Sequence, residues 1–308
     1  MTDDLRYTLP VPPAQPWLDA ERGRPLNRRS ILRKVAAAAA AGAGSGAGFE
    51  ILWPGRAQAR VFKGTAEKGW GSVKGTVVWP KDGPAPPKPR QIDLDKFNLP
   101  AADLKWFTSK GPIYAEDWVI DEKSLGIKWA FVWLMPSVGG AAAKLPVHPS
   151  LEKPAGDTVT MEQPCSGFAP HAVALRQGQK LVVTNQSPVV HAFQWAGMLQ
   201  NGNQAMPPGS KITVGDLLAH RQALRVSCAP HPWEGAWLRV FDHPYFTLTD
   251  AEGRFEIPNA PEGEHRMVVW HESAGWLGGA SGRVGQNVLV EGGGVLDVGR
   301  ITMKARPA

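Results

Sequence analysis

The feature that most constrains this fold is a series of short segments in which apolar and polar residues alternate, separated by turns rich in glycine, proline and aspartate. Alternation with a period of two predicts strands, and few stretches show the period of a helix. With 34 glycines and 28 prolines in 308 residues, the pattern predicts an all-β chain built of β-sandwiches. The predicted strands include residues 71–79, 127–134, 223–227, 236–241, 246–249, 254–257 and 266–271.

The strand pattern restarts after Asp242, with short strands every eight to twelve residues. This restart predicts a first β-sandwich domain over residues 60–241 and a second, smaller β-sandwich over 242–308. The strands at 71–79 and 127–134 are expected to complete the first sandwich. Residues 91–117 show no regular pattern.

The first 59 residues have the character of a leader. Arg28-Arg29 precede a weakly apolar, Ala/Gly-rich stretch at 35–49, and Ala57-Gln58-Ala59 offers small residues for cleavage. The segment resembles a bacterial twin-arginine signal, which implies a periplasmic or extracellular protein. The apolar stretch is too short and too rich in glycine for a membrane span, so no stable span is expected after cleavage. A basic tail or an uncleaved anchor is the alternative.

Charge and motifs exclude several classes of function. The formal net charge of +6 divides into +3 for residues 1–59 and +3 for the remainder, with no basic stripe. A nucleic-acid partner is therefore not expected. The sequence has no nucleophile elbow, phosphate-cradling glycine loop or catalytic carboxylate pair, so a hydrolase is not supported.

Candidate metal ligands lie in two separate segments. In Cys228-Ala229-Pro230-His231 a thiolate and an imidazole three positions apart can face one ion, and His191 offers a second imidazole. A soft His₂Cys set suits copper, and it forms the core of electron-transfer copper sites. The chemistry depends on these three side chains meeting in space.

His171 is the fourth candidate ligand. Residues 172–185 read as a hairpin centred on Gly178, which would place position 171 opposite position 185. His171 would then lie at the same end of the sandwich as Asn185 and the segment leading to His191. The alternative is a hydrogen-bonded histidine at the start of a strand.

The ordered set of Phe168-Ala169-Pro170, Gly178, Asn185, His191 and Cys228-Ala229-Pro230-His231 resembles the cupredoxin family over residues 165–241. The resemblance implies a Greek-key β-sandwich with copper held by His191, Cys228 and His231, and a redox partner protein. Asn185 would tie the two ligand loops together. The family's axial methionine position is occupied here by Ala236, so His171, and then Glu234 or Cys165, are the candidates to replace it. An oxygen or nitrogen donor there should lower the reduction potential.

A wider resemblance covers residues 71–303. Cys165…Pro170-His171, His231-Pro232-Trp233 and Asp242-His243-Pro244-Tyr245-Phe246 resemble exported bacterial proteins, many from planctomycetes, that add a transthyretin-like, carboxypeptidase-regulatory-like domain. That terminal domain is also similar to the fibronectin-like module of rhamnogalacturonan lyases, which implies carbohydrate as an alternative ligand. The resemblance implies no reaction.

The only two cysteines, Cys165 and Cys228, allow a second interpretation. A disulfide between them would close a loop of roughly sixty residues and stabilise the fold by about 4 kcal/mol. The chain would then be a non-enzymatic binding or structural module of the cell envelope, without metal. An electron carrier, a copper enzyme and this envelope module stay open as alternatives.

Overall fold

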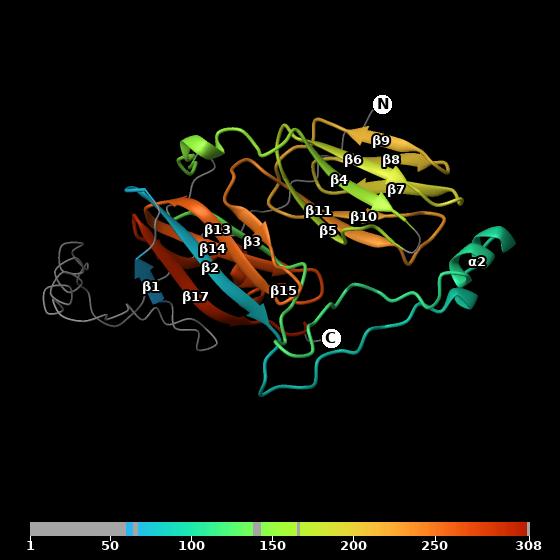
Figure 1. Ribbon diagram of the computed structural model, residues 1–308, viewed down its shortest axis with the longest axis horizontal. Coiled ribbons are helices and arrows are strands. Elements are labelled where there is room, and N and C mark those ends of the chain that lie inside the picture. Colours follow the sequence, from blue (N-terminus) through green and yellow to red (C-terminus); the bar gives the residue numbers. More distant parts are fainter. Residues whose placement is uncertain (1–59, 64–66, 138–142, 165–166, 307–308) are drawn as a thin grey trace, which may run out of the picture. The chain divides into compact units, whose positions relative to one another are not determined.

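The computed structural model describes residues 60–63, 67–137, 143–164 and 167–306 (Figure 1). All of them belong to one compact unit, Gly48–Ala308, and the predicted leader lies outside the described residues. Their regular structure is almost entirely strands arranged in four sheets, which confirms the all-β prediction. In this part of the chain, no helix combines the length and the apolar character needed to cross a membrane.

Eight consecutive strands form what we call the inserted sandwich. Its two sheets have the strand orders β5-β11-β10-β7-β8 and β4-β6-β9. Alternate residues of these strands, among them Leu181, Phe193 and Leu238, are fully buried in one apolar core. The strands are β4 (Thr158–Gln163), β5 (Ala172–Arg176), β6 (Lys180–Asn185), β7 (His191–Ala196), β8 (Asn201–Met206), β9 (Lys211–Val214), β10 (Leu224–Ser227) and β11 (Gly235–Phe241).

Strands from both sides of that segment form the host sandwich. Its sheets have the orders β1-β17-β2-β13 and β12-β3-β14-β15, and β16 also pairs with β14. A second apolar core, which includes Val73, Val132 and Ile257, lies between them. The strands are β1 (Arg60–Lys63), β2 (Trp70–Val78), β3 (Phe131–Pro136), β12 (Phe246–Leu248), β13 (Arg254–Pro261), β14 (Gly263–His271), β15 (Gly275–Trp276), β16 (Gln286–Val290) and β17 (Gly294–Thr302).

The expectation that the strands at 71–79 and 127–134 complete the first sandwich is wrong. β2 pairs with β13 and β17, and β3 pairs with β12 and β14, so both belong to the host sandwich. The predicted domain boundary between residues 241 and 242 therefore does not divide the two sandwiches, because the host sandwich contains strands from both sides of it. Alternation reveals that a strand exists, but its neighbour is chosen by cross-strand packing between residues far apart in sequence.

The predicted hairpin about Gly178 is also wrong. β5 pairs with β11 in one sheet, whereas β6 pairs with β4 and β9 in the other. Gly178 has a φ of +98°, so the turn it permits carries the chain from one sheet to the other. The register that placed His171 opposite Asn185 does not exist.

An aromatic layer joins the two sandwiches along β11. Leu238 and Val240 point into the inserted core, while Trp237, Arg239 and Phe241 alternate onto the opposite face. The Arg239 guanidinium lies 3.7 Å from the ring centre of Trp133 in the host sandwich. Burial in this layer lowers the pKa of Arg239 to about 9.

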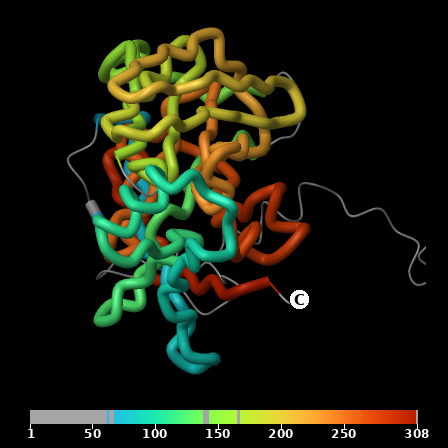
Figure 2. The backbone as a smooth tube through the Cα atoms, turned by 90° about the vertical axis from the view of Figure 1, so that its right-hand side faces the viewer, coloured from blue at the N-terminus to red at the C-terminus, as the bar shows by residue number. Residues whose placement is uncertain are grey.

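The chain between β2 and β3 contains what we call the cap segment, residues 90–117. It holds the 3-10 turn η1 (Leu94–Lys96) and the helix α2 (Ala101–Thr108), where only irregular structure was predicted. Figure 2 shows its backbone in teal and green. Phe107, Ile92 and Ile113 form a small apolar cluster with Val189 of the inserted sandwich, so the segment covers the end of that sandwich. The other 3-10 turns are η2 (Pro149–Leu151) and η3 (Gly279–Val284).

Candidate metal centre

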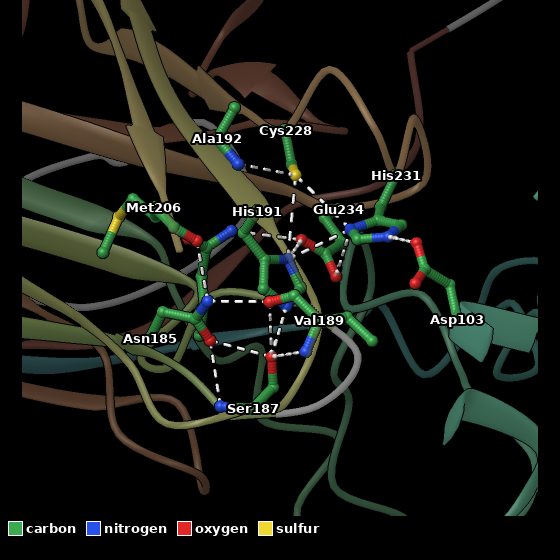
Figure 3. Close-up of polar contacts among 11 residues, drawn as sticks. Asp103, Asn185, Ser187, Val189, His191, Ala192, Met206, Cys228, His231 and Glu234 are labelled. Atoms are coloured by element: carbon green, nitrogen blue, oxygen red, sulfur yellow. Dashed lines mark hydrogen bonds and ion pairs between the residues drawn. The ribbon is translucent and has the colours of Figure 1, made fainter. Parts of the chain in front are cut away.

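Four buried side chains of the inserted sandwich converge beneath the cap segment (Figure 3). They are His191, Cys228, His231 and Glu234, which we call the donor cluster, and each is at most 2% exposed. One potential ligand atom from each lies within 4.8 Å of all the others. The structure thus brings together three of the four predicted residues and adds Glu234.

Strand pairing explains this convergence. β10 and β11 pair with Ser227 opposite Gly235, so the next residues outward, Cys228 and Glu234, flank one turn. The backbone N–H of Glu234 donates to the carbonyl of His231 at 2.9 Å and closes that turn. β7 pairs with the other edge of β10 and begins at His191, at the same end of the sheet.

The spacing of the donor atoms suits one bound cation. The Nδ1 atoms of His191 and His231 are 3.0 Å apart, and Cys228 Sγ lies 3.7 Å and 3.5 Å from them. Glu234 Oε2 lies 3.0 Å from His191 Nδ1, and Oε1 lies 3.7 Å from His231 Nδ1. Ligands held about 2.0–2.3 Å from a tetrahedral metal are separated by about 3.3–3.6 Å, close to these distances.

The outer ring nitrogens of both histidines have hydrogen-bond partners. His231 Nε2 lies 3.4 Å from Asp103 Oδ2, and a carboxylate can only accept, so this nitrogen carries the proton. His191 Nε2 lies 2.9 Å from the hydroxyl of Ser187, which itself donates to Asn185 Oδ1 at 2.8 Å. Nδ1 of His231 therefore presents a lone pair to Nδ1 of His191, which also lies 3.0 Å from the acceptor oxygen Oε2 of Glu234, and a proton or a shared cation at this point relieves the repulsion.

The electrostatics of the cluster lead to the same conclusion. Burial raises the pKa of the Cys228 thiol to about 12, and the Glu234 carboxylate adds to the effect. Burial also lowers the pKa of His231, which keeps that imidazole neutral. Glu234 Oε1 is a buried atom without a hydrogen-bond partner among the described residues. A cation would stabilise the thiolate and engage this oxygen, so the residues fit a metal ion.

Hydrogen bonds hold each donor in place. Asn185 Nδ2 donates to the carbonyls of Val189 (2.9 Å) and Met206 (2.8 Å), so Asn185 ties the segment before His191 to β8 rather than to the Cys228 loop as predicted. The backbone N–H of Ala192 donates to Cys228 Sγ at 3.3 Å. Gln163 Nε2 donates to Glu234 Oε2 at 3.1 Å.

The cap segment supplies functional residues that sequence reasoning missed. Besides the carboxylate of Asp103, α2 places the buried Phe107 ring 4.8 Å from the His231 ring, centre to centre. Trp233 lies 5.3 Å from the same imidazole, centre to centre, and packs on Phe107, so it shields the donor cluster together with α2. Asp103 is distant in sequence from the ligand loops, and no local pattern links it to them.

The structure does not bring His171 into the donor cluster. Its Nε2 pairs with Glu272 Oε1 of the host sandwich, because the hairpin that was expected to carry it to the ligands is absent. His171 is therefore a hydrogen-bonded histidine at the start of β5, which was the alternative to a role as ligand. Ala236, which stands at the expected position of an axial methionine and cannot bind a metal, is buried in the inserted core. Cys228 is a free cysteine in this structure, and Cys165, its partner in the alternative disulfide, lies outside the described residues.

No protein-family model matches this chain, and no curated protein matches its sequence. Similar solved structures include a purple cupredoxin from Nitrosopumilus maritimus, at 17% identity and a TM-score of 0.24, covering 27% of this chain and 98% of that one. A variant of amicyanin matches at 14% identity and a TM-score of 0.25, over 36% of this chain and 98% of its own. A copper-containing nitrite reductase from Thermus scotoductus matches at 14% identity and a TM-score of 0.27, over 32% of this chain and 27% of its own. At these values the similarity identifies no function for this chain.

Proposed function

We propose that this protein is an exported copper-binding protein that serves electron transfer or redox chemistry at one copper ion. Nδ1 of His191 and of His231, Sγ of Cys228 and the carboxylate of Glu234 would hold the ion. The observation that carries the proposal is the pair of Nδ1 atoms facing each other at 3.0 Å beside a buried thiol. Copper bound there would supply one-electron redox chemistry.

The donor types favour copper. Thiolate and imidazole together are the soft set that suits copper, and affinity for a given N/S site rises to a maximum at Cu²⁺ among the divalent first-row metals. A thiolate and a carboxylate with two neutral imidazoles carry a charge of −2, which balances a divalent ion. Glu234 thereby favours the oxidised state of copper over the reduced state, whose charge of +1 would leave the buried site negative.

The cap segment determines how the centre meets other molecules. His231 is fully buried beneath Phe107, and its outer nitrogen faces Asp103. A redox partner protein would therefore dock on the cap segment rather than on a bare imidazole edge. The surrounding apolar side chains keep bulk water from the donors.

Export is part of the same proposal. Its support is the sequence of Arg28-Arg29, the Ala/Gly-rich stretch and Ala57-Gln58-Ala59. The mature protein would begin at Arg60 and act in the periplasm or outside the cell. N-terminal sequencing of the protein recovered from the periplasm tests this directly, and an uncleaved chain in the cytoplasm would contradict it.

Reconstitution tests the metal. Purified protein loaded with Cu²⁺ should hold one copper per chain and show an intense thiolate-to-copper absorption band. Reducing the sample should bleach that band, because the charge transfer requires Cu²⁺. A protein that holds zinc but no copper, or one whose two cysteines are locked in a disulfide and which binds no metal, would refute the proposal.

A further inference from the structure

The donor cluster is closed to solvent by the cap segment. Each of its four side chains is at most 2% exposed, so an ion can reach them only if part of the chain moves. The Phe107 ring of α2 lies over His231, and Asp103 of the same helix faces the outer nitrogen of that imidazole (Figure 3). The cap segment is therefore the cover whose movement would open the cluster.

The two ends of the cap segment are joined to each other in what we call the cap neck, residues 90–92 and 113–117. Two backbone hydrogen bonds, of 2.8 Å and 2.9 Å, run between these ends, and the side chains of Arg90 and Asp117 pair at 3.6 Å. The carbonyl of Asp117 also accepts from the hydroxyl of Ser273 in the host sandwich at 2.8 Å. The neck is thus closed on itself and fixed to the host sandwich.

The cap head, residues 93–112, rests on the inserted sandwich mainly through apolar contacts. Its backbone hydrogen bonds, in the described part of the chain, all stay within the head. The ring of Phe97 lies 4.9 Å from that of Trp233, centre to centre. The one polar contact that the described residues show between head and sandwich is the pair of Asp103 and His231.

This mode of attachment makes the cap head the easiest part of the site to move. Apolar contacts are non-directional, and separating them leaves no backbone group without a hydrogen-bond partner. The strands that carry the donors would instead have to break ladder hydrogen bonds before they could move apart. Local opening of a loosely attached segment costs less free energy than unfolding of the whole protein.

We propose that the cap head opens as a unit on the cap neck and so admits metal ions to the donor cluster. In the open state Cys228 and His231 face solvent, while both sandwiches stay folded. The role in metal entry rests on the proposed function. The opening itself does not, and it is tested without metal.

Two phenylalanines allow a matched test. Phe97 is partly buried in the cap head and packs on Trp233 rather than on a donor. Phe246 is also partly buried, with its ring 4.2 Å from that of Phe241 in the aromatic layer between the sandwiches. Phe97→Ala should weaken the closed state of the cap, because truncating a packed ring removes its contacts. Phe246→Ala removes the same ring at a site outside the cap segment.

Alkylation of the Cys228 thiol by iodoacetamide, followed by mass spectrometry of the metal-free mature protein, measures the opening. Every sample also carries Cys165→Ser, so that Cys228 is the only thiol. Phe97→Ala should raise the alkylation rate about tenfold or more, whereas Phe246→Ala should leave it unchanged. Urea below the unfolding transition should raise the rate with a much smaller slope than that of global unfolding, because opening the cap exposes little surface. Uptake of Cu²⁺ should be accelerated in the same variant.

Three results would overturn the proposal. They are equal alkylation rates with and without Phe97→Ala, a urea slope equal to that of global unfolding, and immediate alkylation of the protein that keeps Phe97. Alkylation as expected in a protein that takes up no copper would support the opening and refute the proposed function instead.

Discussion

Buried histidines occur in both sandwiches, but their surroundings differ. In the host sandwich, His271 is fully buried and stacks on Trp118, with ring centres 4.6 Å apart. Its Nδ1 accepts from the backbone of Ser273, and burial lowers its pKa to about 4. In the inserted sandwich, His191 and His231 instead have partners on their outer nitrogens and turn both Nδ1 atoms toward each other.

The comparison teaches that burial alone does not make a metal site. His271 has a hydrogen-bond partner on Nδ1 only, its buried Nε2 has none among the described residues, and it belongs there to no group of potential ligands. The donor cluster concentrates lone pairs and potential negative charge in one place, which a bound metal ion would stabilise.

Removing a donor should abolish copper binding, whereas removing His271 should not. Cys228→Ser and His191→Ala should each reduce bound copper from one per chain to nearly none, because each deletes a ligand. His271→Phe keeps an aromatic ring against Trp118 and should retain full loading. Metal content by elemental analysis after gel filtration gives the answer. Full loading of the Cys228→Ser variant would show that the cluster is not the site.

Stability against pH should depend on the host-sandwich histidine. In the unfolded chain His271 has a pKa near 6.5, whereas in the folded chain its pKa is lowered to about 4. Between these values the unfolded state binds more protons, so the free energy of unfolding should fall by about 3 kcal/mol as pH drops from 6.5 to 4. His243, whose pKa burial also lowers to about 4, should add to this loss.

The variant His271→Phe isolates that contribution. Urea unfolding at pH 7 and at pH 4.5 should show a smaller pH dependence for the variant than for the natural protein. An unchanged pH dependence would mean that His271 is not the group responsible. The measurement is made on metal-free protein, so that loss of metal at low pH does not enter.

Glu234 should set the preference for oxidised copper. Glu234→Gln keeps the shape of the side chain but removes a charge close to the ion. Two unit charges about 4 Å apart interact by about 4 kcal/mol in surroundings of intermediate polarity, so the reduction potential should rise on the order of 100 mV. Spectroelectrochemical titration measures it. Glu162→Gln, at an exposed neighbouring strand position, is the control; equal potentials in the two variants would remove Glu234 from the ligand set.

Asp103 should have the smallest effect, since it acts through His231. Asp103→Asn weakens the acceptor for the Nε2 proton, and loss of such a partner lowers metal affinity about 10–100-fold. Asp95→Asn, at an exposed position of the same segment, should change nothing. Competition with a copper chelator measures both. A merely structural role of Asp103 would lower the melting temperature of the metal-free protein and leave the affinity unchanged.

The local sequence pattern agrees with the structure where neighbouring residues decide the conformation. Strands 223–227 and 236–241 were predicted nearly as observed, and Cys228 and His231 share one turn as their spacing predicts. The local pattern predicted the wrong structure where the outcome depends on which distant strands pair. The three cases are the pairing of β2 and β3, the crossing between sheets at Gly178, and the position of His171. The helix α2 was missed because it is only eight residues long, and its buried side chain, Phe107, packs against a distant loop.

By itself, the sequence determined that the chain is all-β and which loops carry thiol and imidazole, because alternation and short spacings are local properties. Only the tertiary structure decided that one sandwich is inserted in the other, that Glu234 rather than His171 joins the cluster, and that α2 covers it. Those outcomes depend on contacts between residues more than a hundred positions apart, such as Asp103 with His231 and His171 with Glu272. Contacts of that kind are selected by the packing of the whole core, which no local pattern encodes.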